Sequence, residues 1–143
     1  MGDISEKKND RVPSPHQQQH KDIKEAVVLI VEDEPGIRQL LKTILKRHVK
    51  QIFEANNGQA GVDLCREHPE ITVVLMDIKM PVMSGLEATR LIKSFHKELP
   101  VIVVTAFALA EDKAAAMNAG CDDFLVKPFK ADDLLRKISE YGV

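Results

Sequence analysis

Residues 27–34 read VVLIVEDE, an unbroken apolar run that ends in three acids. A run that is apolar at every position, rather than at every second one, predicts a strand buried on both faces, as in a parallel sheet covered by helices. Similar runs occupy residues 71–76, 101–105 and 124–126, and residues 49–55 form a weaker, more polar one. The sequence therefore predicts five strands.

Segments with helical periodicity lie between these runs. Apolar residues recur every three or four positions in residues 37–45, 88–95 and 134–141, and weaker helical segments occupy residues 59–68 and 110–119. Strand and helix thus alternate five times along the chain. Because crossovers between parallel strands are right-handed, this order predicts an α/β fold, a doubly wound five-stranded parallel sheet with helices on both faces.

The composition fits one domain of this class. The chain has 143 residues, 44% of them hydrophobic, and its net charge of −2 argues against a surface that coats nucleic acid. No apolar run approaches the roughly 20 residues of a membrane helix, and the polar N-terminus differs from a secretory signal. Cys65 and Cys121 lack the spacing of metal ligands. We expect free thiols in a cytoplasmic protein, with no direct nucleic-acid binding and no membrane contact by this segment.

Residues 1–25 differ from the rest of the chain. Their few large apolar residues follow no period. The segment also contains Pro13, Pro15 and three glutamines at 17–19. Such a segment cannot bury enough surface to offset its chain entropy. We predict a flexible tail or linker over residues 1–25 and one domain over residues 26–143.

Side chains that can carry chemistry follow the predicted strands. They are Glu32 and Asp33 after the first strand, Asp77 after the third, Thr105 at the end of the fourth and Lys127 after the fifth. Ligands of doubly wound sheets bind outside these carboxyl ends, so we expect the five side chains to converge. Clustered carboxylates repel one another unless a cation neutralises them. A set of oxygen ligands suits Mg²⁺ that keeps several waters.

Such a set can receive phosphate oxygens. A metal ion and an ammonium neutralise charge, and a hydroxyl donates a hydrogen bond. The sequence contains neither a GxxxxGK[ST] loop nor a GxGxxG loop, which argues against a nucleotide or dinucleotide site. A carboxylate is available instead to accept a phosphoryl group covalently.

Four stretches resemble the receiver domain of two-component response regulators. They are VVLIVEDEP (27–35), VVLMDIKMPVMSGLEATRLIK (73–93), PVIVVTAFA (100–108) and AGCDDFLVKPF (119–129). They occur in the family's order and at its spacing, and the resemblance covers essentially all of residues 26–143. It implies a flavodoxin-like sheet with the strand order 2-1-3-4-5.

The resemblance also implies roles for the acidic residues. Asp77 matches the phosphoacceptor, and Glu32 and Asp33 match the acidic pair that holds Mg²⁺, directly or through water. Lys79, two residues after the acceptor, would offer its backbone carbonyl to the metal. Ser84 stands where the family usually has Asp or Asn, but serine can cap the following helix equally well.

Other matches concern the phosphoryl group and a conformational switch. Thr105 and Lys127 would contact phosphoryl oxygens, and the Lys127–Pro128 bond would be cis. Phe124 occupies the aromatic switch position and lacks the hydroxyl of a switch tyrosine. Phe107 is apolar and cannot orient a hydrolytic water. We expect the switched surface to lie around residues 108–119 and 124–136.

The implied function is that of a phosphorelay domain. It would take a phosphoryl group from a histidine kinase or a histidine phosphotransfer domain onto Asp77, with Mg²⁺ as cofactor, and then bind a phosphorylation-dependent partner. It would catalyse its own phosphorylation without being a conventional turnover enzyme. Two contexts stay open, a stand-alone regulator and the C-terminal receiver of a hybrid histidine kinase.

Two alternatives fit the residues less well. A haloacid-dehalogenase-like phosphatase also uses a strand-end Asp with Mg²⁺, but it needs a second Asp two residues later, where this chain has Lys79. A degenerate receiver would bind partners without phosphorylation. The intact set of Asp33, Asp77, Thr105 and Lys127 argues against that alternative.

Overall fold

The computed structural model describes residues 22–106 and 109–141. Within them, parallel strands form one sheet in the order β2-β1-β3-β4-β5. The strands are β1 (Val27–Val31), β2 (Gln51–Ala55), β3 (Val73–Met76), β4 (Val101–Thr105) and β5 (Asp123–Val126). The predicted strand order and the doubly wound class are confirmed.

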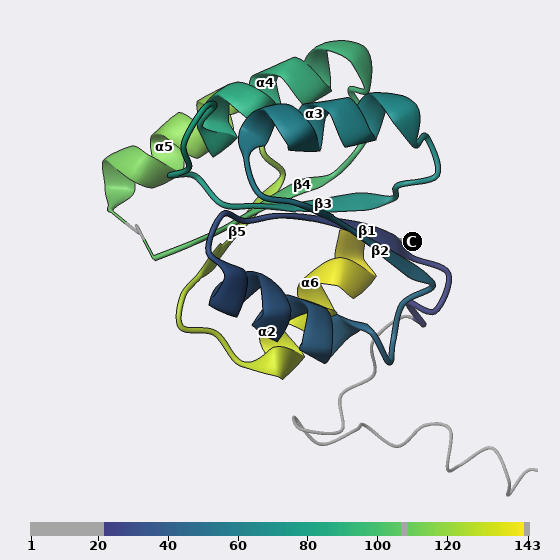
Figure 1. The fold of residues 1–143 in the computed structure, drawn as a ribbon. Coiled ribbons are helices and arrows are strands. Elements are labelled where there is room, and N and C mark those ends of the chain that lie inside the picture. The colour runs from purple at the N-terminus through teal and green to yellow at the C-terminus, as the bar shows by residue number, and fades with distance from the viewer. Residues whose placement is uncertain (1–21, 107–108, 142–143) are drawn as a thin grey trace, which may run out of the picture.

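Helices cover the sheet in two layers (Figure 1). One face carries α2 (Pro35–Leu45) and α6 (Ala131–Tyr141), and the other carries α3 (Gly58–Glu67), α4 (Gly85–Phe95) and α5 (Ala110–Ala119). None of these helices has the length and apolar character needed to cross a membrane.

The core is split by the sheet into two clusters of buried side chains. Neighbours along β1 alternate between them, so that Leu29 packs under α3 and α4 while Val28 packs under α2 and α6. Because successive side chains of a strand point to opposite faces, both must be apolar. This explains the unbroken apolar runs of the sequence.

Two strands begin later than the apolar runs that predicted them. The Val49 amide donates to Leu45 O at 3.2 Å, which continues the end of α2 and delays β2 to Gln51. The Ile71 amide donates to His68 O at 3.1 Å in a turn, so β3 begins at Val73. Local backbone hydrogen bonds thus hold Val49 and Ile71 outside the strands to which their apolar character alone assigned them.

The predicted tail is only partly covered by the described residues. Ile23, which we assigned to the tail, is buried at 7% exposure in the cluster beneath α2 and α6. Its carbonyl accepts a hydrogen bond from the Ala26 amide at 2.9 Å. The packed region therefore begins before residue 26, whereas residues 1–21 and Phe107 lie outside the described part.

Candidate functional site

A pocket of about 630 Å³ opens where β1, β3, β4 and β5 end. Its lining is mostly charged and consists of Glu32, Asp33, Glu34, Ile37, Asp77, Lys79, Ala106 and Lys127. The charged residues that the sequence placed at strand ends therefore meet in one cavity. This is the edge at which doubly wound sheets bind their ligands.

Three carboxylates face one another in this pocket. One oxygen from each of Glu32, Asp33 and Asp77 lies within 4.8 Å of the others. Glu32 is 2% exposed and Asp77 is 8% exposed, whereas Asp33 is open to solvent. The cluster could hold a metal ion, and its oxygen donors suit a hard divalent cation.

The surroundings of Asp77 raise the pKa of its carboxyl to about 6. Burial is the largest cause, and the negative charge of Glu32 is the next. The Lys127 ammonium opposes both effects. A cation bound among the three carboxylates would lower this pKa, because it would favour the ionised form.

Lys127 brings a positive charge next to two of these carboxylates. Its Nζ donates to Glu32 Oε1 at 3.0 Å and lies 4.0 Å from Asp77 Oδ1. The Lys127 amide donates to Thr105 O at 2.8 Å, which fixes the end of β5 against β4. The predicted cis bond between Lys127 and Pro128 is present.

Thr105 and Phe124 lie on the two neighbouring strands β4 and β5. Thr105 is fully buried, one residue before Ala106 of the pocket lining. Phe124 pairs in register with Val103 and is half-buried against the core under α3 and α4. The Nζ atom of Lys113 in α5 lies 5.7 Å from the centroid of its ring.

Gly85 is a site residue that the sequence analysis missed. Its amide donates to Ile78 O at 2.7 Å, and a Cβ at this position would lie 1.9 Å from the backbone oxygen of Asp77. Ser84, just before it, caps α4 by accepting from the Glu87 amide at 3.2 Å, as predicted. A glycine is therefore required so that α4 can begin against the backbone of Asp77.

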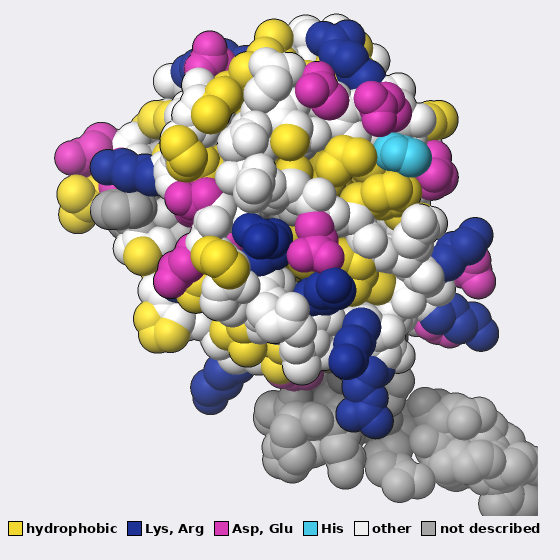
Figure 2. All heavy atoms as spheres, viewed as in Figure 1, with side chains coloured by type: hydrophobic (Ala, Val, Ile, Leu, Met, Phe, Trp, Pro, Cys, Tyr) yellow, Lys and Arg dark blue, Asp and Glu magenta, His cyan; other side chains and the backbone are white. Residues whose placement is uncertain are grey.

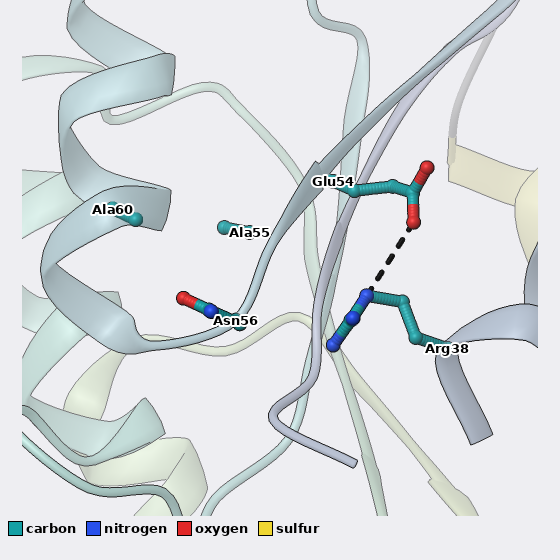
Figure 3. A pocket seen from close by; sticks show the side chains of 5 residues that line it. All are labelled: Arg38, Glu54, Ala55, Asn56 and Ala60. Carbon is teal, nitrogen blue, oxygen red and sulfur yellow. Dashed lines mark ion pairs between the residues drawn. The ribbon is translucent and has the colours of Figure 1, made fainter. Parts of the chain in front are cut away.

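Arg38 is the second missed residue. Its Nη1 donates to the backbone oxygen of Glu32 at 2.7 Å, and its Nε lies 3.4 Å from Glu54 Oε1 (Figure 3). Helical periodicity gave no signal for this role, since it marks Arg38 only as a polar residue beside Ile37. The contact depends on β1 and α2 being packed together.

Charges on the face seen in Figure 2 are mixed. The face in Figure 2 carries basic and acidic side chains next to one another, with apolar side chains in small groups between them. A nucleic-acid-binding face would instead gather Lys and Arg into a patch or stripe.

Comparison with known proteins agrees with the fold. The sequence profile of the response regulator receiver domain matches residues 28–139. The regulatory protein AtoC of Escherichia coli (strain K12) is 39% identical over 108 residues, which are 75% of this chain and 23% of that protein. The transcriptional regulatory protein SrrA of Staphylococcus aureus (strain NCTC 8325 / PS 47) is 34% identical over 111 residues, 78% of this chain and 45% of that protein. The chain thus matches less than half the length of these two relatives.

Solved structures give the same result. The chemotaxis protein CheY4 of Vibrio cholerae superposes with a TM-score of 0.76 at 28% identity, over 82% of this chain and 98% of that chain. A chain of the CheX-CheY-BeF3-Mg²⁺ complex from Borrelia burgdorferi superposes with a TM-score of 0.76 at 30% identity, over 80% and 88% of the two chains. On the sequence match, the sheet order and these structures, the chain belongs to the response regulator receiver domain family.

Proposed function

We propose that this domain accepts a phosphoryl group on Asp77 from a phosphohistidine of a partner protein, and that Mg²⁺ is its cofactor. The observation that supports this most directly is the meeting of three carboxylates and the Lys127 ammonium in one pocket of a receiver fold. In this proposal Glu32, Asp33 and Asp77 hold the metal, together with the backbone carbonyl of Lys79.

The chemistry follows from the charges in the pocket. An oxygen of the ionised Asp77 carboxylate forms the new bond to phosphorus while the bond from phosphorus to the histidine nitrogen breaks, and the imidazole leaves with the bonding electrons. Bound Mg²⁺ supplies charge neutralisation for the phosphoryl oxygens. A pKa of about 6 leaves Asp77 mostly ionised at neutral pH and therefore nucleophilic.

Lys127 and Thr105 are proposed to receive the phosphoryl oxygens. The Lys127 ammonium already lies 4.0 Å from Asp77, so a small movement brings it to a phosphoryl group there. Thr105 ends the strand beside Asp77 and would donate its hydroxyl. Movement of Thr105 would then change the space available to Phe124 and the surface formed by residues 109–119 and 124–136.

An apolar groove beside the pocket supports a protein as the phosphoryl donor. The groove has a volume of about 310 Å³ and is lined by Ile37, Leu40, Ala106, Lys127, Pro128 and Phe129. It shares three of these residues with the acidic pocket, and Leu40 is 49% exposed. A histidine kinase or phosphotransfer domain that packs on this groove would bring its phosphohistidine next to Asp77.

The test is phosphorylation of the purified chain by a small-molecule phosphodonor with Mg²⁺, followed by intact-mass measurement. We expect one phosphoryl group per chain, labile to alkali, in the wild type and in the control Asp63→Asn, since Asp63 is exposed on α3. Asp77→Asn should incorporate none. Incorporation that persists in Asp77→Asn would contradict the assignment, and no incorporation in the wild type would favour a degenerate receiver.

A further inference from the structure

The backbone of Glu32 is held at both its amide and its carbonyl group. The Glu32 amide donates to Ala55 O of β2 at 3.0 Å. The Glu32 carbonyl oxygen accepts from Nη1 of Arg38 at 2.7 Å. Since this carbonyl belongs to the peptide plane that leads into Asp33, whatever holds it also orients the backbone from which Asp33 projects.

Arg38 is itself held in place by β2. Its Nε lies 3.4 Å from Glu54 Oε1 (Figure 3). The other oxygen of Glu54 lies 2.9 Å from Nζ of Lys42, one turn further along α2. The Arg38 side chain is 22% exposed, so its planar group is restricted by these contacts. The guanidinium thus links β2, α2 and the end of β1 at a single point.

We propose that Arg38 is a positioning residue for the metal-binding acids and that it acts through the Glu32 carbonyl. This inference rests on the proposed function, because it concerns the same acidic cluster. The carboxylate of Glu32 is fixed separately, by Lys127 at 3.0 Å and by the Glu34 amide at 3.2 Å. Asp33 is exposed, so the orientation of its backbone is the main restraint that Arg38 can provide.

The sign of the expected effect separates positioning from simple electrostatics. Arg38 is a cation close to a site for a cation, so its charge alone opposes Mg²⁺ binding. If charge were its main influence, Arg38→Met would bind Mg²⁺ more tightly. If Arg38 positions Asp33, Arg38→Met binds Mg²⁺ more weakly. The backbone at Asp33 must then become ordered when the metal binds, and the entropy lost in ordering it reduces the binding free energy.

The experiment is a Mg²⁺ titration of the unphosphorylated full chain, followed by amide NMR shifts, with the free energy of unfolding measured for every variant. We expect Arg38→Met to weaken Mg²⁺ binding about tenfold, since residues that orient metal ligands typically contribute this much. The order parameters of the Asp33 and Glu34 amides should fall in the same variant. Arg38→Lys should restore part of the affinity, because one ammonium can reach the Glu32 carbonyl or Glu54 but not both.

Lys42→Met is the matched control, since Lys42 also pairs with Glu54, whereas within the described part of the chain Arg38 is the side chain that donates to the Glu32 carbonyl. It should leave the Mg²⁺ affinity within about twofold of the wild type. Equal weakening in Lys42→Met and Arg38→Met would overturn the inference, because it would assign the effect to the ion pairs of Glu54. Unchanged or tighter binding in a folded Arg38→Met would also overturn it.

The remaining outcomes cover a variant that does not fold and separate this inference from the proposed function. If Arg38→Met does not fold, wild-type affinity in Arg38→Lys overturns the positioning role, and partial affinity supports it. If the wild type shows no Mg²⁺ binding that depends on Asp33, the metal site itself fails. If the wild type binds Mg²⁺ through Asp33 and all Arg38 variants bind equally, only the positioning role fails.

Discussion

Lys127 is bound closely to Glu32 and only loosely to Asp77. Its Nζ lies 3.0 Å from Glu32 Oε1 and 4.0 Å from Asp77 Oδ1. The Glu32 side chain is 3% exposed, so it depends on this ammonium for compensation of its charge. Asp77 is left less well compensated, and burial together with the charge of Glu32 raises its pKa to about 6. The Lys127 ammonium thus compensates the charge of Glu32 more than that of Asp77.

The raised pKa predicts that Asp77 destabilises the metal-free fold at neutral pH. The folded protein holds the Asp77 proton up to about pH 6, whereas the unfolded chain releases it near 3.8. The folded state therefore binds more protons between these values, and the contribution of Asp77 to the free energy of unfolding falls as the pH rises through them, by about 2–3 kcal/mol. The loss is nearly complete at pH 7.

The measurement is chemical denaturation at several pH values, with a chelator present. We expect Asp77→Asn to be more stable than the wild type at pH 7 and to match it near pH 4, where the folded wild type carries the protonated Asp77. The difference between the two proteins isolates the contribution of Asp77 from that of other titrating groups. A difference that is constant over this range would contradict the raised pKa.

Opposite charge changes next to Asp77 should move its pKa in opposite directions. Glu32→Gln removes a negative charge and frees the ammonium of Lys127, so the pKa of Asp77 should fall towards its ordinary value. Lys127→Met removes the opposing cation, so the pKa should rise further. Carboxyl carbon shifts followed by NMR titration would give both values, and a shift of the same sign in both variants would contradict this electrostatic account.

Two glycines provide a matched pair for testing the packing of α4 against Asp77. Gly85→Ala places a Cβ 1.9 Å from Asp77 O, so the backbone must move; we expect a loss of at least about 2 kcal/mol in the free energy of unfolding. In Gly36→Ala the new Cβ meets nothing within 4 Å, and we expect a gain of up to about 1 kcal/mol because alanine favours the helix.

Denaturation curves of the two variants would check this pair. A phosphorylation assay on folded Gly85→Ala would show whether the proposed phosphorylation of Asp77 depends on this packing. Equal stability of the two alanine variants would show that α4 does not need its close approach to the Asp77 backbone.

Lys113 is expected to bias the position of Phe124. A cation 5.7 Å from the ring centroid of Phe124 at an exposed site stabilises that ring position by about 0.5–1 kcal/mol. Lys113→Met should remove this preference and shift the aromatic resonances of Phe124 in the unphosphorylated protein. Lys130→Met, on the loop before α6, is the control. Unchanged Phe124 resonances in Lys113→Met would show that the contact carries no preference.

Much of the fold follows from local properties of the sequence. Unbroken apolar runs predicted β1, β3 and β4 because these strands are buried on both faces. Ser84 and Gly120 also predicted helix ends: Ser84 caps α4 with its side chain, and Gly120 ends α5 with a φ of 104°. The order of the strands came from the family resemblance, since periodicity says which segments are strands but not which of them pair. The predicted start of β3 differs from the observed one because the amide of Ile71 is hydrogen-bonded within a turn.

The sequence by itself determined which charged residues share a site. Parallel strands end at one edge of the sheet, so residues that directly follow strands, such as Asp33, Asp77 and Lys127, must lie near one another. The tertiary structure alone decided how they interact. Lys127 and Glu32 are 95 positions apart, and whether the ammonium lies nearer to Glu32 or to Asp77 depends on differences of about an ångström in packing. The contact of Arg38 with the Glu32 carbonyl has the same origin, because it requires the particular angle at which α2 packs beside β1 and β2.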